Sequence, residues 1–149
     1  MAECSDSVDI AAPPDAVFAA VSHLEQMGRY SPENTGGTWI KGATGPARGA
    51  KFRGTNKHGS SGWTTTATVT DFDPPRTFGF DVTFGPFKVS RWRYEIEPTA
   101  TGSRVTESWS DRRGSFVRNR TKGIVADREA FTRQSIRSTL DAIKASLEA

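Results

Sequence analysis

Cysteine is almost absent from this sequence, and so is any long hydrophobic segment. A single thiol, Cys4, excludes an internal disulfide. No apolar run reaches the length of about 18 residues that a membrane-spanning helix needs. The first ten residues, MAECSDSVDI, show neither the basic start nor the apolar stretch of a secretory signal. We therefore expect a protein of the reducing cytoplasm that is not stably inserted in a membrane.

Histidine is scarce as well, since His23 and His58 are the only two. Together with Cys4 they offer too few ligands for a zinc site, which needs about three or four. No GxSxG elbow, phosphate-binding P-loop or dinucleotide fingerprint is present. We expect neither a metal nor a cofactor.

Neither sign of charge dominates, because the sequence contains 20 Lys and Arg residues and 17 Asp and Glu residues, for a net charge of +3. The basic residues gather in one place only, a cluster made of Arg112, Arg113, Arg118, Arg120 and Lys122. Such runs usually form a solvated surface. A nucleic-acid or acidic-surface binder is the alternative, and salt would weaken its binding steeply. Nucleic-acid binding would also require several exposed aromatic residues beside the cluster on one surface. Because we see no such interleaving of several aromatic residues, we expect no nucleic-acid partner.

What the sequence does contain is enough chain for one domain, residues 1–149, with a substantial core. Val8 and Ile10 alternate with polar residues, which predicts a strand. Pro13 and Pro14 end it and begin a helical region that lasts to about Ser31. This region predicts two short helices after the first strand.

Residues 35–111 are rich in Gly, Thr and aromatic residues and alternate between apolar and polar positions. Turn signals separate the alternating runs, so they predict an antiparallel meander of short strands. The tail differs, because Ile136, Leu140, Ile143 and Leu147 recur at helical spacing. It predicts a long C-terminal helix from Ile124 to Leu147, with a break near Gly123 and a short separate turn before it.

The sheet and the long helix each have an apolar face to bury, so each is the other's natural partner. The sheet face is aromatic, whereas the helix presents small residues there, Thr132, Ser135 and Thr139. Bulky strands facing small helical residues predict a pocket between the two. In the alternative, neighbouring large side chains fill that space, as in most close-packed interiors.

The strand RVTESWSDR raises the main chemical question. Its alternation places Glu107 on one face with Val105 and Trp109, although burying an unpaired carboxylate is costly. Glu107 could form a structural ion pair, with Arg128 as the expected partner. It could instead be solvated at a pocket mouth. In a third interpretation it is an acid or a polar anchor inside the pocket, with Tyr94 or Tyr30 as a second hydrogen-bonding group.

The order of the segments resembles the SRPBCC superfamily, which includes START lipid-transfer domains, birch-pollen-allergen-like proteins and polyketide cyclases/dehydrases. The resemblance rests on VDIAAPPDAVFAAVS, MGRYSPE, DPPRTFGF, WRYEIEP, GSRVTESWSD and TLDAIKASLE. In similar sequences Trp often stands at the position of Tyr30, which here places a hydroxyl at the pocket side. The resemblance implies an α+β helix-grip fold: a curved antiparallel sheet of six or seven strands wrapped around the C-terminal helix. It also implies a deep, mostly apolar cavity between the sheet and that helix.

Two functions follow from these expectations. The first is a carrier or sensor that binds a hydrophobic small molecule such as a lipid or polyketide, and the alternative is an enzyme of the polyketide cyclase/dehydrase type. Candidate catalytic residues are Glu107 and Tyr94. Expected ligand contacts are Tyr30, Phe52, Trp63, Phe80, Trp92, Tyr94, Glu107, Trp109, Phe131, Ser135 and Thr139. An unpaired Glu107 beside Tyr94 would favour catalysis, and an ion-paired Glu107 would favour binding.

Overall fold

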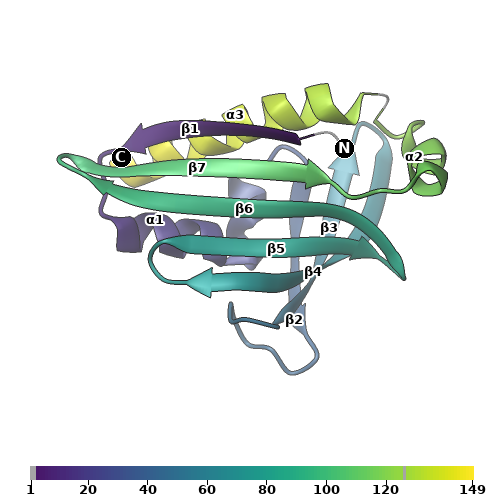
Figure 1. The fold of residues 1–149 in the computed structure, drawn as a ribbon, viewed down its shortest axis with the longest axis horizontal. Coiled ribbons are helices and arrows are strands. Elements are labelled where there is room, and N and C mark those ends of the chain that lie inside the picture. Colours follow the sequence, from purple (N-terminus) through teal and green to yellow (C-terminus); the bar gives the residue numbers. More distant parts are fainter. Residues whose placement is uncertain (1–2, 126) are drawn as a thin grey trace.

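A computed structural model describes residues 3–125 and 127–149, which form a curved seven-stranded antiparallel sheet and a small set of helices (Figure 1). The spatial order of the strands is β1-β7-β6-β5-β4-β3-β2, so β1 pairs with the last strand and β2 forms the opposite edge. The strands are β1 (Glu3–Ile10), β2 (Asn34–Ile40), β3 (Lys51–His58), β4 (Ser61–Asp73), β5 (Thr77–Phe84), β6 (Phe87–Thr99) and β7 (Gly102–Asp111). This confirms the expected helix-grip architecture.

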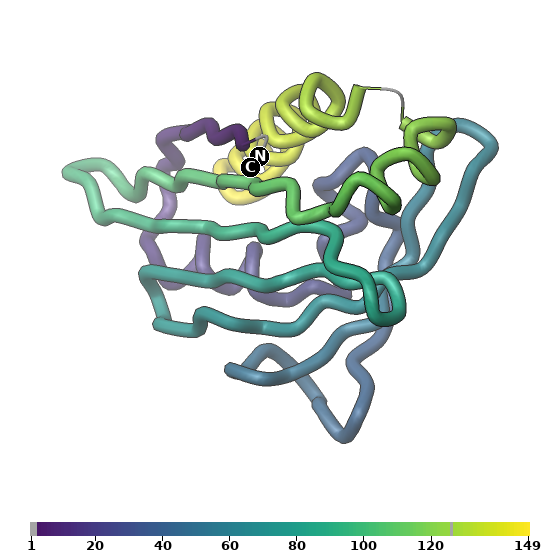
Figure 2. The backbone as a smooth tube through the Cα atoms, turned by 45° about the vertical axis from the view of Figure 1, so that its right-hand side comes forward, coloured from purple at the N-terminus to yellow at the C-terminus, as the bar shows by residue number. Residues whose placement is uncertain are grey.

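Helices cover one face of the sheet. The short α1 (Pro14–Ser22) and a 3-10 helix, η1 (Leu24–Arg29), follow β1 as expected, and α2 (Ser115–Thr121) follows β7. The long α3 (Arg128–Glu148) runs beside β1, and Figure 2 shows the sheet bending around the helices from β1 to β2. Pro14 occupies the first turn of α1, where its missing N–H removes no helical hydrogen bond.

The long helix begins later than the sequence predicts. It starts at Arg128 rather than Ile124, and the Asp127 side chain caps it by accepting a hydrogen bond from the Ala130 backbone N–H. Residues 122–124 instead form a turn after α2, and Ala126, within the predicted helix, lies outside the described residues. The predicted apolar stripe holds nonetheless, because Ile136, Leu140 and Ile143 are fully buried.

Local irregularities give the sheet its curvature. The pairing register shifts in β2 between Asn34 and Gly36, in β4 between Val69 and Asp71, and in β6 between Lys88 and Ser90. Such bulges bend a strand and increase its twist. At Gly37, with φ of +152°, a Cβ atom would collide with the Arg53 carbonyl oxygen, so the close approach of β2 to β3 requires glycine there.

The inner face of β7 shows how the alternating pattern places polar groups in the core. Ser103, Val105, Glu107, Trp109 and Asp111 are all buried, whereas the intervening residues are partly or fully exposed. Glu107 therefore does lie on the interior face, as the alternation predicts.

None of the helices in residues 3–125 and 127–149 is both long enough and apolar enough to span a bilayer.

Candidate pocket between the sheet and the C-terminal helix

A pocket of about 280 Å³ opens between the inner face of the sheet and the helices. Its floor is made by β3 to β7, and Ser135 and Thr139 of α3 lie on the opposite side. Both α3 residues are buried yet small, so the helix leaves room that leucine or isoleucine would occupy. Of the residues predicted to contact a ligand, the pocket brings together Phe52, Trp63, Phe80, Trp92, Tyr94, Glu107, Trp109, Ser135 and Thr139.

Two of the predicted ligand contacts, Tyr30 and Phe131, do not line this pocket. Phe131 turns toward the end of β3, where its ring meets the His58 ring edge to face with centroids 4.7 Å apart. The Arg128 guanidinium lies 5.5 Å from the centre of the Phe131 ring, on the same helix. Tyr30 is partly buried and packs against the hydrophobic core at the end of η1. Phe131 lies on α3 between the lining residues Arg128 and Ser135, but its ring packs against His58 instead of entering the pocket.

Glu107 and Tyr94 meet at the pocket. They are direct partners in the register of β6 and β7, and their side chains project from the same face. The Tyr94 hydroxyl donates a hydrogen bond of 2.8 Å to Glu107 Oε2. Only 3% of Glu107 and 2% of Tyr94 is exposed, and Glu107 Oε1 has no hydrogen-bond partner among the described residues. The site therefore holds a buried carboxyl group with one oxygen unsatisfied.

Burial changes the protonation of this pair. Desolvation raises the pKa of Glu107 to about 8, against the opposing effect of the Tyr94 hydrogen bond. Burial also raises the pKa of Tyr94 well above its usual range, and the neighbouring carboxylate adds to that effect. Near neutral pH, Glu107 is thus mainly an uncharged carboxylic acid, able to donate a proton or a hydrogen bond into the pocket.

Arg128 is not the partner of Glu107, contrary to the sequence-based expectation. Its guanidinium donates to both carboxylate oxygens of Glu33, at 3.0 and 2.8 Å. Arg128 begins α3 and Glu33 immediately precedes β2, so this ion pair joins two elements at the edge of the pocket. Within residues 3–125 and 127–149, no cation pairs with Glu107.

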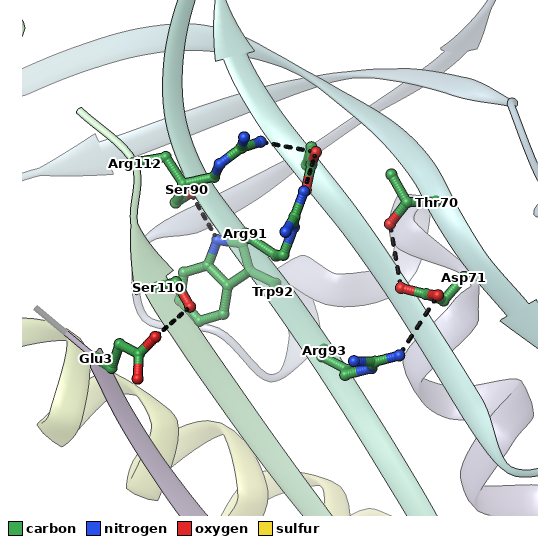
Figure 3. Close-up of polar contacts among 10 residues, drawn as sticks. Glu3, Thr70, Asp71, Ser90, Arg91, Trp92, Arg93, Ser110 and Arg112 are labelled. Atoms are coloured by element: carbon green, nitrogen blue, oxygen red, sulfur yellow. Dashed lines mark hydrogen bonds and ion pairs between the residues drawn. The ribbon is translucent and has the colours of Figure 1, made fainter. Parts of the chain in front are cut away.

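The aromatic wall is fixed by polar contacts as well as by packing. The Trp92 indole N–H donates to Ser90 Oγ at 3.0 Å (Figure 3), and both residues line the pocket. On the other face of the sheet, Arg91 and Arg112 both donate to Asp81, at 2.7 and 2.9 Å. These contacts tie β5, β6 and the segment after β7 together behind the pocket.

Sequence reasoning missed several groups that the fold adds to the lining. Met27 of η1 lies beside Tyr94, with the hydroxyl 4.0 Å from its sulfur. Arg113 reaches the pocket while it forms a buried ion pair of 2.8 Å with Asp111. Val117 and Thr121 bring α2 to the pocket edge. In the sequence, only the spacing of the apolar residues Leu24 and Met27 in η1 pointed to these additional lining residues. Arg113 gave no such signal, because it looked like part of a solvated basic cluster.

Among the residues that the structure describes, no three His, Cys, Asp or Glu side chains are grouped in a way that could hold a metal ion.

Comparison with known proteins identifies the family. The model of the family described as "Polyketide cyclase / dehydrase and lipid transport" matches residues 1–148. The chain belongs to this family. No curated protein matches the sequence significantly.

Solved structures agree with the assignment. The Polyketide_cyc-like protein Cgl2372 from Corynebacterium glutamicum is 32% identical, with a TM-score of 0.67, and the match covers 98% of this chain and 91% of that one. The di-domain ARO/CYC protein BexL, from the BE-7585A biosynthetic pathway, is 18% identical with a TM-score of 0.75. That match covers 99% of this chain but 50% of BexL, and at this identity it shows the shared fold alone.

Proposed function

We propose that this protein binds a hydrophobic small molecule, such as a lipid or a polyketide, in the pocket and acts as a carrier or sensor. The observation that carries the proposal is the pocket itself, lined by aromatic and aliphatic side chains with the Glu107–Tyr94 pair as a local polar group. Binding sites for small molecules commonly combine an apolar wall with a few convergent polar groups. The family description, which includes lipid transport, supports the same function.

The size and chemistry of the pocket narrow the kind of ligand. About 280 Å³ lies near the lower end of the usual range for ligand sites, which favours a compact guest over a large two-chain lipid. A neutral Glu107 offers a hydrogen bond to a carbonyl or hydroxyl oxygen. The same buried acid disfavours a ligand that brings a carboxylate next to it, because two acids would then share one desolvated site.

A second candidate function, a polyketide cyclase/dehydrase activity, is favoured by one specific observation. Glu107 forms no ion pair among the described residues and lies beside Tyr94, the arrangement that favours catalysis over simple binding. In a dehydration, the Glu107 carboxyl would protonate a substrate hydroxyl, and the C–O bond would break to release water. The resulting carboxylate would then accept the proton from the adjacent carbon as the double bond forms, which restores the acid.

Binding can be tested by filling the pocket from the helix side. We expect Ser135→Leu to weaken the binding of a fluorescent apolar probe by at least about tenfold, because the larger side chain takes the space of the guest. The matched control is Ser138→Leu, which adds the same side chain at an exposed position of the same helix. Equal probe affinity in the two variants would contradict the proposal.

Carrier and enzyme can be separated once a ligand is known. The protein is purified gently from its native host, and co-purifying small molecules are identified by mass spectrometry. The identified compound is then incubated with wild type and with Glu107→Gln, and its conversion is measured. Return of the compound unchanged supports a carrier. Conversion by wild type but not by Glu107→Gln, with binding retained, supports the enzyme, because glutamine keeps the shape of the acid but cannot exchange its proton.

A further inference from the structure

Three phenylalanines lie on the surface at the end of the molecule that carries α2. Phe84, Phe87 and Phe116 are 52%, 42% and 59% exposed, and they are the only large hydrophobic residues exposed to this extent in the described part of the chain. We call them the phenylalanine patch. Single exposed hydrophobic residues need no explanation, but a group of three aromatic side chains does.

The patch is built from two separate elements. Phe84 ends β5 and Phe87 begins β6, and the two pair across the exposed turn Gly85–Pro86. Phe116 comes from α2, and its ring lies 6.1 Å from that of Phe87. Figures 1 and 2 both show the tip of the β5–β6 hairpin and α2 at the same end of the molecule. The hairpin tip and α2 together present an exposed aromatic surface.

Positive charge adjoins the phenylalanine patch. Residues 112–125 contain the whole basic cluster and no acidic residue. Lys88, Arg120 and Lys122 form no ion pair with any described residue, and the Arg120 guanidinium lies 5.1 Å from the centre of the Phe116 ring. The aromatic residues beside this cluster were not recognised from the sequence. Phe116 lies within the cluster, and folding adds Phe87 of the hairpin next to it.

The patch also adjoins the pocket. Phe84 is half exposed and also lines the pocket. Val117 and Thr121 of α2 line the pocket as well. An apolar guest that enters or leaves beside Phe84 would therefore pass next to the exposed rings. A surface that offers aromatic side chains and positive charge at that point matches the interface of a membrane with an anionic surface.

We propose that the phenylalanine patch and the basic residues around it dock this protein on anionic lipid bilayers, with the pocket mouth turned toward the membrane. The rings of Phe84, Phe87 and Phe116 enter the headgroup region, while Lys88, Arg120 and Lys122 contact lipid phosphates and carboxylates. This interaction goes beyond the proposed ligand binding and does not depend on it. An exposed turn suits a penetrable lipid surface better than single-stranded nucleic acid, which needs a groove that follows its backbone.

Vesicle sedimentation tests the proposal directly. We expect wild type to bind vesicles of phosphatidylcholine mixed with phosphatidylserine, and to bind pure phosphatidylcholine vesicles much more weakly. Binding should be lost at about 1 M salt, where charges are screened beyond about 3 Å. Arg120→Glu/Lys122→Glu should weaken binding by at least about twentyfold, since each basic residue near an anionic surface contributes a factor of about five. Phe87→Ser/Phe116→Ser should also weaken it strongly.

Two controls show whether the effects belong to this surface. Lys41→Glu/Arg48→Glu makes the same charge change in the exposed loop between β2 and β3, at the bottom of Figure 1, and should leave vesicle binding unchanged. Ser135→Leu should still bind vesicles, so failure of the pocket and failure of docking are distinguishable. Absence of vesicle binding, equal binding by the patch variants and wild type, or binding only to single-stranded DNA or an acidic protein would each overturn the proposal.

Discussion

Tyr94 and Glu107 face each other across β6 and β7, and the tyrosine hydroxyl donates its hydrogen bond to one oxygen of the buried carboxyl group, at 2.8 Å. This contact satisfies half of the carboxyl and leaves Oε1 without a partner among the described residues. An acid in this position is held neutral by burial and is kept in a fixed orientation by its neighbour. The effects expected of changing Glu107 and Tyr94 follow from this arrangement.

Stability should fall as pH rises because of Glu107. Its pKa in the folded protein is about 8, above the ordinary value of 4.5, so between these values the folded state keeps a proton that the unfolded chain has released. The free energy of unfolding therefore decreases from about pH 4.5 to about pH 8, by about 1.4 kcal/mol for each pH unit. Glu107→Gln should remove this component. Chemical denaturation of both proteins across this range measures it, and parallel pH profiles would show that Glu107 titrates normally.

Removal of the Tyr94 hydroxyl should destabilise the protein. Tyr94→Phe removes the one hydrogen bond that Glu107 accepts from a side chain of the described residues, at a cost of about 1–3 kcal/mol in the free energy of unfolding. Since the Tyr94 hydrogen bond lowers the pKa of Glu107, its loss should also extend the pH-dependent decline to higher pH. Urea denaturation measures both effects. The control Tyr30→Phe removes a hydroxyl from a partly exposed tyrosine and should change stability little, so equal losses in the two variants would argue against a special role for the pair.

The Arg128–Glu33 ion pair should couple strongly. Its side chains are 19% and 15% exposed and share two hydrogen bonds, so solvent screens them less than surface pairs. A double-mutant cycle with Arg128→Ala and Glu33→Ala should give a coupling of at least about 1 kcal/mol. In the pair Arg133–Glu129 the side chains are 58% and 46% exposed, and its coupling energy should be about 0.3–0.5 kcal/mol. Equal couplings would mean that the pair at the pocket edge is solvated like a surface pair.

Asp81 should contribute stability that acid removes. The hydrogen bond from Arg91 is the main cause of its lowered pKa, with Arg112 adding to it, so the stabilisation is present above the ordinary pKa of 3.8. It is lost as pH falls through the lower pKa of the folded state. Asp81→Asn should cost at most about 1 kcal/mol near neutral pH, because water still reaches the cluster, and should cost less in acid. Thermal denaturation at several pH values measures the difference, with Asp73→Asn at an exposed turn as the control.

The sequence was sufficient to predict the sheet, the long helix and the interior position of Glu107. Alternation in β7 and the stripe of Ile136, Leu140 and Ile143 are local patterns, and burial enforces both. The predicted start of the long helix was wrong, because the helical spacing of apolar residues continues across the break between α2 and α3. Only the cap provided by Asp127 marks the true start.

The partners of the site residues could not be predicted, because they depend on how distant segments meet. Arg128 was expected beside Glu107, yet it binds Glu33, which precedes β2 and is far from it in sequence. The Tyr94–Glu107 contact requires the exact register of β6 against β7, and a shift of one residue would place the two side chains on opposite faces. Likewise, Phe116 and Phe87 come together only in the folded chain.

Ser135 and Thr139 line the pocket from α3, whereas its acid and aromatic rings come from the strands, and protein engineering can use this separation. These two short side chains determine how much space is left. Because the space and the polar pair come from different secondary-structure elements, replacing those two helical residues with smaller or larger ones should resize the pocket and leave the Glu107–Tyr94 pair in place.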